Sequence, residues 1–130
     1  MSERKSISQR VLVTGASGAI GTPVCQHLLT RGHRVRGFSL EPNPNLDEQV
    51  IGDLSDFAAV RRAVADIDVV IHLGAYPNNA DFLDVLLEPN VRGLCHVCAA
   101  AVETGVKRLA LASSLQVISG HKKEGLIRVE

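Results

Sequence analysis

The stretch of sequence that decides the fold is residues 11–24, VLVTGASGAIGTPV, in which three glycines follow an apolar run. Residues 10–14, RVLVT, are mostly β-branched and apolar, which predicts a short strand buried on both faces. Apolar side chains then recur at helical spacing, which predicts a helix over residues 19–31. Pro23 falls in the first turn of that helix and Gly32 just past its end, where helices accept proline and favour glycine.

The three glycines, Gly15, Gly18 and Gly21, are spaced as in turns that hold the pyrophosphate of a dinucleotide. In such a turn Gly15 permits the sharp bend, Gly18 lets the backbone approach the ligand, and Gly21 lets the helix pack against the strand. The amino end of the following helix offers free N–H groups and a partial positive charge to the phosphates. A glycine turn that serves packing alone is the alternative.

The rest of the chain alternates strand and helix patterns at short intervals. Strands are predicted at residues 35–40, 49–51, 68–73 and 107–112. Helices are predicted at 55–65, capped by Ser55 or Asp56, and at 89–103, where Pro89 lies near the start, with a single helical turn around 82–87. This alternation predicts an α/β protein with a doubly wound parallel sheet, the Rossmann fold, in strand order 3-2-1-4-5. At 130 residues the chain is long enough for one such domain, residues 1–130, which we expect to be NAD(P)-binding if the glycine turn holds a dinucleotide.

The composition argues against several classes of function. Fourteen basic residues balance fourteen acidic ones and aromatic residues make up only 3%, so no nucleic-acid partner is expected. No apolar stretch approaches the roughly 18–20 residues of a membrane span, and the polar first ten residues do not resemble a secretory signal. We therefore expect a small-molecule partner and no membrane partner.

The cysteines, Cys25, Cys95 and Cys98, are odd in number and lack the spacing of a disulfide scaffold, which favours a reducing, cytoplasmic location. Cys95 and Cys98 have the CxxC spacing of some metal and redox sites, but a structural zinc site needs four ligands and no second pair is visible. They lie in an alanine-rich helical stretch. We expect buried or half-buried helix residues there, and no metal.

Five short motifs occur in order along the chain: TGASGAIG at 14–21, GDL at 52–54, HLGA at 72–75, NVRG at 90–93 and LASS at 111–114. Together they resemble the extended short-chain dehydrogenase/reductase superfamily, specifically its NAD-dependent epimerase/dehydratase family, over residues 11–120. Within that family, residues 72–114 are most similar to uronate dehydrogenases, which oxidise a sugar acid at C1 to a lactone with NAD. The resemblance implies an NAD(P)-dependent oxidoreductase or epimerase/dehydratase that acts on a sugar, sugar acid or nucleotide-sugar.

The resemblance also implies roles for individual residues. Ser114 is the implied catalytic residue, which orients the substrate hydroxyl or carbonyl. Asp53 and Leu54 are implied to hold the adenine, and Gly74 and Ala75 to line the nicotinamide side. The full set implied to bind the cofactor is Gly15, Ala16, Ser17, Gly18, Ala19, Ile20, Gly21, Ser39, Asp53, Leu54, Leu73, Gly74, Ala75, Asn90 and Ser113.

Several of these residues also have a plain structural interpretation. Asp53 can cap the turn that follows it, and Asn90 is as readily structural as functional. Ser113 and Ser114 can satisfy backbone groups at the end of a strand. His72, inside an apolar strand, is more readily a hydrogen-bonded core histidine than a catalyst.

Ser39 leaves the choice between NAD and NADP open. Family members that use NAD usually carry Asp at this place, where it binds the ribose 2′-hydroxyl and repels a 2′-phosphate. Serine removes that repulsion, yet Glu41 and not a cation follows closely, and Arg34 and Arg36 lie on the strand itself.

The catalytic Tyr-x-x-x-Lys pair of the family has no counterpart within residues 1–130. Tyr76 is the one tyrosine, and Ala80 stands where the lysine would be. The resemblance places the pair beyond Glu130, so we expect an N-terminal, cofactor-binding half of a longer enzyme, with the sheet incomplete at its C-terminal end and this chain inactive alone. A homodimer is one arrangement expected of the longer form. The alternative is a non-catalytic NAD(P)-binding sensor or interaction module.

Overall fold

The computed structural model describes residues 7–114, which form five strands and four helices. The strands are β1 (Arg10–Thr14), β2 (Arg34–Ser39), β3 (Glu48–Ile51), β4 (Val69–His72) and β5 (Arg108–Leu111). The helices are α1 (Gly21–Thr30), α2 (Phe57–Val64), η1 (Phe82–Arg92) and α3 (Gly93–Thr104). Gly120 and the other residues after 114, which enter the sequence comparison, lie outside the described part of the chain.

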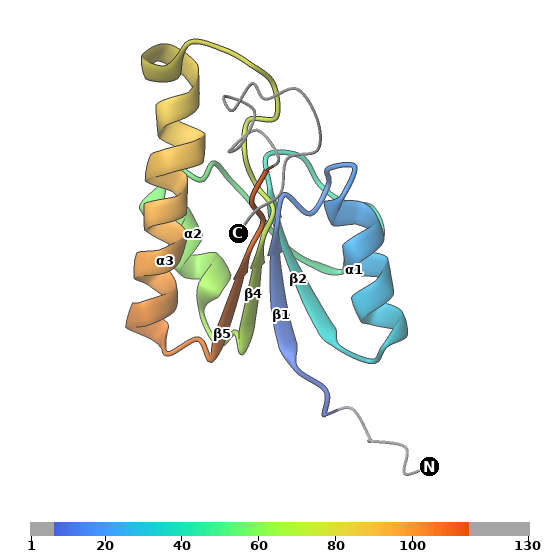
Figure 1. Ribbon diagram of the computed structural model, residues 1–130. Coiled ribbons are helices and arrows are strands. Elements are labelled where there is room, and N and C mark those ends of the chain that lie inside the picture. Colours follow the sequence, from blue (N-terminus) through green and yellow to red (C-terminus); the bar gives the residue numbers. More distant parts are fainter. Residues whose placement is uncertain (1–6, 115–130) are drawn as a thin grey trace, which may run out of the picture.

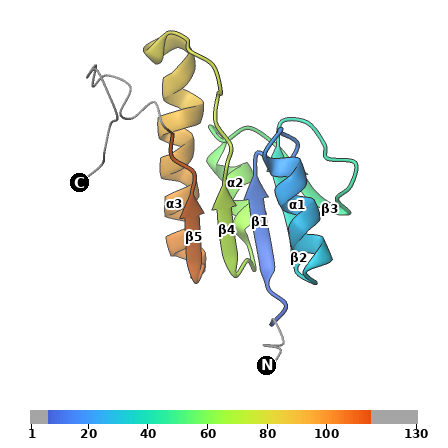
Figure 2. The ribbon, with the colours of Figure 1, turned by 45° about the vertical axis from the view of Figure 1, so that its right-hand side comes forward.

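The five strands form one parallel sheet in the order β3-β2-β1-β4-β5, which Figure 2 shows from β5 across to β3. The central strand β1 pairs with β2 from Arg10↔Arg34 to Thr14↔Phe38 and with β4 on its other side. Helix α1 covers one face of the sheet, and α2 and α3 cover the other (Figure 1). The predicted doubly wound α/β fold and its strand order are confirmed.

Both faces of the sheet are apolar because each is covered by helices. Toward α1, the buried side chains include Val11, Val13 and Cys25. Toward α2 and α3, a larger cluster forms around Leu12 and Phe38. Successive residues of β1 therefore point into opposite cores, as the period of a strand requires.

The helix boundaries follow the capping residues. α1 begins at Gly21, two residues later than expected, because residues 19 and 20 still belong to the turn. Gly32, with φ of +82°, follows its end as predicted. At α2, Asp56 is the cap, and its Oδ1 accepts the N–H of Ala59 at 3.1 Å.

The helix predicted to begin near Pro89 begins earlier, and that prediction is wrong. η1 starts after Asp81, whose carboxylate accepts the N–H of Asp84 at 2.9 Å, and it continues into α3 without a break. Pro89 therefore lies inside a helix. The hydrogen bonding around it is of the wide π type, with the N–H of Gly93 donated to Glu88 O, and this wider turn accommodates a proline ring that would clash in an α-helix.

The continuous helix Phe82–Thr104 corrects a second expectation, that no apolar segment approaches the length of a membrane span. The helix has 23 residues, and an 18-residue window within it reaches a mean hydropathy of 1.2, so it is long and apolar enough by length and composition to cross a membrane. That criterion is weak evidence, because core helices of soluble proteins also satisfy it. Here the second half of the segment packs against α2, and Arg61 of α2 forms an ion pair with Glu103.

The cysteines are only partly as expected. Cys25 is buried and Cys98 is half-buried, but Cys95 is exposed, because α3 packs through its Val97 and Ala100 face. Burial raises the pKa of the Cys25 thiol. Within residues 7–114, no group of three or more His, Cys, Asp or Glu side chains is placed to hold a metal ion.

Candidate cofactor-binding site

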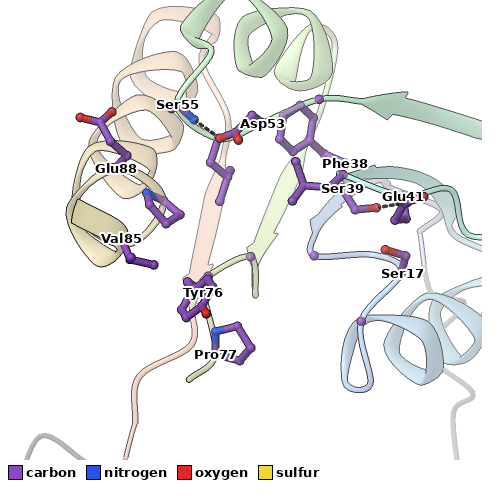
Figure 3. Close-up of a pocket in the computed structure, with 18 of the residues that line it drawn as sticks. Ser17, Phe38, Ser39, Glu41, Asp53, Ser55, Tyr76, Pro77, Val85 and Glu88 are labelled. Atoms are coloured by element: carbon purple, nitrogen blue, oxygen red, sulfur yellow. Dashed lines mark hydrogen bonds between the residues drawn. The ribbon is translucent and has the colours of Figure 1, made fainter. Parts of the chain in front are cut away.

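A cavity of about 580 Å³ opens at the carboxyl ends of the strands, where open α/β sheets place their ligands. Its volume is in the range of small-molecule sites. Figure 3 shows Ser17, Ser39 and Glu41 on one side, Val85 and Glu88 opposite, Asp53 and Ser55 at one end, and Tyr76 with Pro77 at the other. Of the residues proposed from the sequence, those that line it are Gly15, Ser17, Gly18, Ser39, Asp53, Leu54, Gly74 and Ala75.

The glycine turn is built so that side chains would not fit. Gly15 has a φ of +70°, and a Cβ on it would lie 3.0 Å from Gly74 Cα. A Cβ on Gly21 would lie 1.9 Å from Gly15 O, so α1 can start here only with glycine. The N–H of Gly15 binds Phe38 O at 2.8 Å, which ties the turn to the end of β2.

The amino end of α1 is open to a ligand. Its N-cap residue, Ile20, makes no side-chain capping hydrogen bond, and the first turn holds no acidic residue. An uncapped helix start presents a partial positive charge to an anion. In the first turn the N–H of Thr22 is donated to Gly18 O at 3.0 Å and Pro23 has no N–H, so the N–H groups for a ligand come from the turn ahead of the helix and from Gly21. Ala19, Ile20 and Gly21 shape this end without lining the cavity, and Ala16 is fully buried beneath it.

Thr14 and His72 form a buried pair below the cavity. Thr14 Oγ1 accepts the N–H groups of Leu73 and Gly74 at 3.1 and 3.0 Å and lies 2.7 Å from His72 Nδ1. Burial lowers the pKa of His72. The interpretation of His72 as a hydrogen-bonded core histidine is confirmed, and Leu73 serves the site through its backbone, since it is not among the described lining residues.

The GDL motif supplies one end of the cavity. Asp53 Oδ1 accepts the N–H of Ser55 at 2.8 Å, so Asp53 does cap the turn that follows it. Its side chain is exposed and lines the cavity, so the carboxylate also faces ligand space. Leu54 packs close to α3, because a Cβ on Gly93 would lie 2.7 Å from Leu54 Cβ. The glycine of NVRG therefore permits close helix packing.

The end of β2 carries one acidic side chain and no available cation. Ser39 Oγ donates to Glu41 O at 2.8 Å, and both residues line the cavity. Arg36 is engaged by Glu48 and donates to Ala63 O and Ala65 O at 2.8 and 2.7 Å. Arg34 begins the strand that Ser39 ends, five residues or roughly 16 Å away.

Asn90 holds the loop after β4. Its Oδ1 accepts the N–H of Tyr76 at 2.7 Å, and its Nδ2 donates to Tyr76 O at 3.3 Å. It thus binds both backbone groups of one residue and fixes Tyr76 and Pro77 at the mouth of the cavity. Asn90 itself is not among the described lining residues, which favours its structural interpretation.

The serine pair lies at the expected end of the sheet but away from this cavity. Ser113 and Ser114 follow the end of β5 after Ala112 and are exposed, and neither is among the described residues that line the cavity. The structure therefore brings the glycine turn, Ser39 and the GDL motif together around the cavity. Ser113 and Ser114 are not among its described lining residues.

Sequence reasoning predicted a helical turn around 82–87, at the start of η1, but missed that η1 forms a wall of the cavity. Asp84, Val85, Glu88 and Pro89 line the cavity. The Asp81 cap, three residues ahead of Asp84, was the available signal for an earlier helix start. Phe38 and Glu41 were also missed as lining residues, because no motif marks them.

Comparison with known proteins supports the family that the five sequence motifs indicated. The NAD dependent epimerase/dehydratase family matches residues 11–127. The chain belongs to this family. It is 37% identical to a 2-alkyl-3-oxoalkanoate reductase of Stenotrophomonas maltophilia over 90% of its length, and 33% identical to a uronate dehydrogenase of Pseudomonas putida over 88%. A short-chain dehydrogenase/reductase superfamily protein from Agrobacterium tumefaciens, solved with bound NAD, superposes with a TM-score of 0.83 at 37% identity and covers 90% of this chain.

The match covers only part of each relative. The chain spans 37% of the reductase, 44% of the uronate dehydrogenase and 36% of the solved Agrobacterium protein. The part in common is the part that holds the five motifs. The suspected family, including the resemblance to uronate dehydrogenases, is confirmed.

Proposed function

We propose that the protein is an NAD-dependent oxidoreductase or epimerase/dehydratase of the extended short-chain type, and that residues 7–114 supply its cofactor site. The observation that carries this proposal is the cavity at the carboxyl edge, bounded by a glycine turn that leaves no space for a side chain at Gly15 or Gly21 and by the uncapped start of α1. A pyrophosphate fits such a turn, because the backbone is free to approach it closely.

Individual residues then take definite roles. The turn from Gly15 to Gly21 binds the pyrophosphate through backbone N–H groups. Asp53 accepts from the adenine amino group with the oxygen that Ser55 does not use, and Leu54 packs against the adenine ring. Gly74 and Ala75 line the cavity on the proposed nicotinamide side. Close packing within the protein favours glycine at position 74, since a Cβ there would meet Leu54 and Thr14 at 3.0 and 3.1 Å.

The charges around the ribose position favour NAD over NADP. Glu41 lines the cavity beside Ser39, and the lining residues found within 7–114 include no Lys or Arg to pair with a 2′-phosphate. Arg36, the nearest cation along β2, is occupied by Glu48 and two carbonyl oxygens. A carboxylate near the ribose repels a third phosphate, so we propose NAD as the cofactor.

The reaction assigned to the whole protein goes beyond this part of the chain. Bound NAD supplies a hydride acceptor or donor at its nicotinamide ring. We propose that Ser114, at the end of β5, orients the substrate hydroxyl or carbonyl. A sugar or sugar acid is the proposed substrate class, supported by the uronate dehydrogenase among the relatives. Cytoplasmic location and a homodimer of the longer form remain predictions.

Calorimetric titration of the protein with NAD and with NADP tests the proposal. We expect saturable binding of NAD, and binding of NADP about fivefold weaker because of Glu41. Failure to bind NAD at millimolar concentration would refute the proposed function. Formation of NADH by the longer form of the protein, with a panel of uronic acids and aldoses, then separates an enzyme from a non-catalytic NAD sensor, which would bind NAD without turnover.

A further inference from the structure

The loop between β2 and β3 contains a side chain that the cofactor motifs do not explain. Asn43 is 1% exposed, although its neighbours in the loop, Pro42 and Pro44, are exposed. A buried amide must find partners for its donors and acceptor, so its hydrogen bonds show what the residue is for.

Asn43 joins two loops that are far apart in sequence. Its Nδ2 donates to Ala16 O at 2.8 Å, across a separation of 27 residues, and this oxygen belongs to the glycine turn. Its Oδ1 accepts the N–H of Asn45 at 2.9 Å, which fixes the local turn. One side chain therefore holds its own loop in shape and fastens that loop to the glycine turn.

The contact between the loops is closely packed as well as hydrogen-bonded. Ala16 is fully buried, and Leu46 of the β2–β3 loop packs in the same core. A Cβ on Gly37 of β2 would lie 2.7 Å from Leu46 Cδ1 and 3.0 Å from Ala16 Cβ. The absence of a side chain at Gly37 is what lets the two loops meet above β2.

A second amide, Gln49, stabilises the same loop without reaching the glycine turn. Its Oε1 accepts the N–H of Asn43 at 2.9 Å, and its Nε2 donates to Asn43 O and Leu46 O at 3.2 and 3.0 Å. Gln49 and Asn43 thus differ in their contact with the glycine turn. Of these two amides, only Asn43 forms the bond to Ala16.

We propose that Asn43 is a positioning residue that sets the spacing between the two halves of adenosine diphosphate recognition. The inference rests on the proposed function. The β2–β3 loop carries Glu41, which lines the cavity at the proposed ribose position, and the glycine turn lines it at the proposed pyrophosphate position. Asn43 fastens the β2–β3 loop to the glycine turn. Its bond to Ala16 therefore increases the affinity of a ligand that contacts both loops, and it has little effect on the affinity of a ligand that lacks phosphates.

Asn43→Ser tests the inference, with Gln49→Ala as the matched control. Serine can still accept the N–H of Asn45 in a similar turn, but its side chain is too short to reach Ala16 O. We expect the Kd of ADP and of NAD to rise about fivefold in Asn43→Ser, the effect of losing one ordinary hydrogen bond, while the Kd of adenosine changes less than about twofold. Gln49→Ala should leave the ratio of the Kd of adenosine to the Kd of ADP unchanged.

The outcomes separate this inference from the function on which it rests. If the wild-type protein binds ADP and Asn43→Ser raises the constants of ADP and adenosine equally, Asn43 has no more than a structural role and the inference is wrong. If the wild-type protein binds neither ADP nor NAD, the proposed function fails and the inference with it.

Hydrogen exchange on the wild-type protein provides a measurement that needs no variant. ADP should slow exchange of the backbone amides of residues 40–47 more than saturating adenosine does, because the glycine turn and this loop are fastened together. Equal protection by the two ligands would overturn the inference.

Discussion

His72 is expected to remain neutral in the folded protein, and hydrogen-bond geometry gives the reason. Thr14 Oγ1 accepts from the N–H groups of Leu73 and Gly74, which uses both acceptor positions of a hydroxyl. Its own proton is therefore donated to His72 Nδ1, 2.7 Å away. That nitrogen must then be unprotonated, and a neutral His72 carries its proton on Nε2.

Protonation of His72 would break this arrangement. An Nδ1–H would point at an oxygen that already accepts two hydrogen bonds, and the positive charge would lie in a site where the residue is only 7% exposed. Burial accordingly lowers the pKa of His72 from its ordinary value of 6.5. In the unfolded chain the ring is solvated and takes up a proton near the ordinary pKa.

The effect on stability has a definite sign. Above about pH 6.5 the ring is neutral in both states and contributes no pH dependence. Below it the unfolded chain binds one more proton than the folded one, so the free energy of unfolding falls by up to about 1.4 kcal/mol per pH unit. The free energy of unfolding stops falling once the pH is below the lowered pKa of His72 in the folded state. Asp68, whose pKa is lowered by its hydrogen bond from Lys107, titrates below this range.

Urea unfolding of the wild-type protein and of His72→Asn at about pH 7.5 and about pH 5.5 measures the effect. The Asn Oδ1 can accept the Thr14 hydroxyl but does not titrate, and the other histidines are common to both proteins. We expect the wild type to lose about 1 kcal/mol more than the variant between these two pH values. Equal losses would refute the reasoning, as would an NMR nitrogen shift showing a proton on His72 Nδ1 at neutral pH.

Three further substitutions test separate parts of the structure. Glu41→Gln should tighten NADP binding about fivefold by removing roughly 1 kcal/mol of repulsion. The control Glu88→Gln, on the opposite wall of the cavity, should not. Calorimetry that finds the same NADP affinity for the two variants would contradict the NAD preference. Gly21→Ala should weaken NAD binding more than about tenfold because its Cβ overlaps Gly15 O, while Gly32→Ala at the other end of α1 should lower Tm and leave the Kd unchanged. Asp56→Ala should cost about 1 kcal/mol of stability through the lost cap, and a urea midpoint equal to that of the wild type would exclude the cap.

The features that could be predicted from the sequence are those with a local cause. The glycine turn is recognised by its spacing between a strand and a helix, and the cap of α2 is narrowed to Ser55 or Asp56, because a tight turn and a helix cap each depend on a few consecutive residues. The structure identifies Asp56 as the cap. The parallel order of the strands followed from the alternation of elements. The NAD family followed from five motifs in order, and the matching family confirms it.

The features that escaped prediction depend on contacts between distant segments. Pro89 normally marks a helix start, and its place inside η1 depends on a π-type turn that no sequence rule identifies. Asn43 looked like an ordinary loop residue, because its partner Ala16 is 27 positions away. Cys95 was expected to be at least half-buried, but its exposure depends on which face of α3 meets the sheet.

A crystal structure of the protein grown with NAD tests the central claim most directly. The account predicts the dinucleotide in the cavity at the carboxyl edge of the sheet, with its pyrophosphate on backbone N–H groups between Gly15 and Gly21 and its adenine between Asp53 and the η1 wall. Electron density for NAD at any other place, or a cavity that stays empty at saturating NAD, would contradict it.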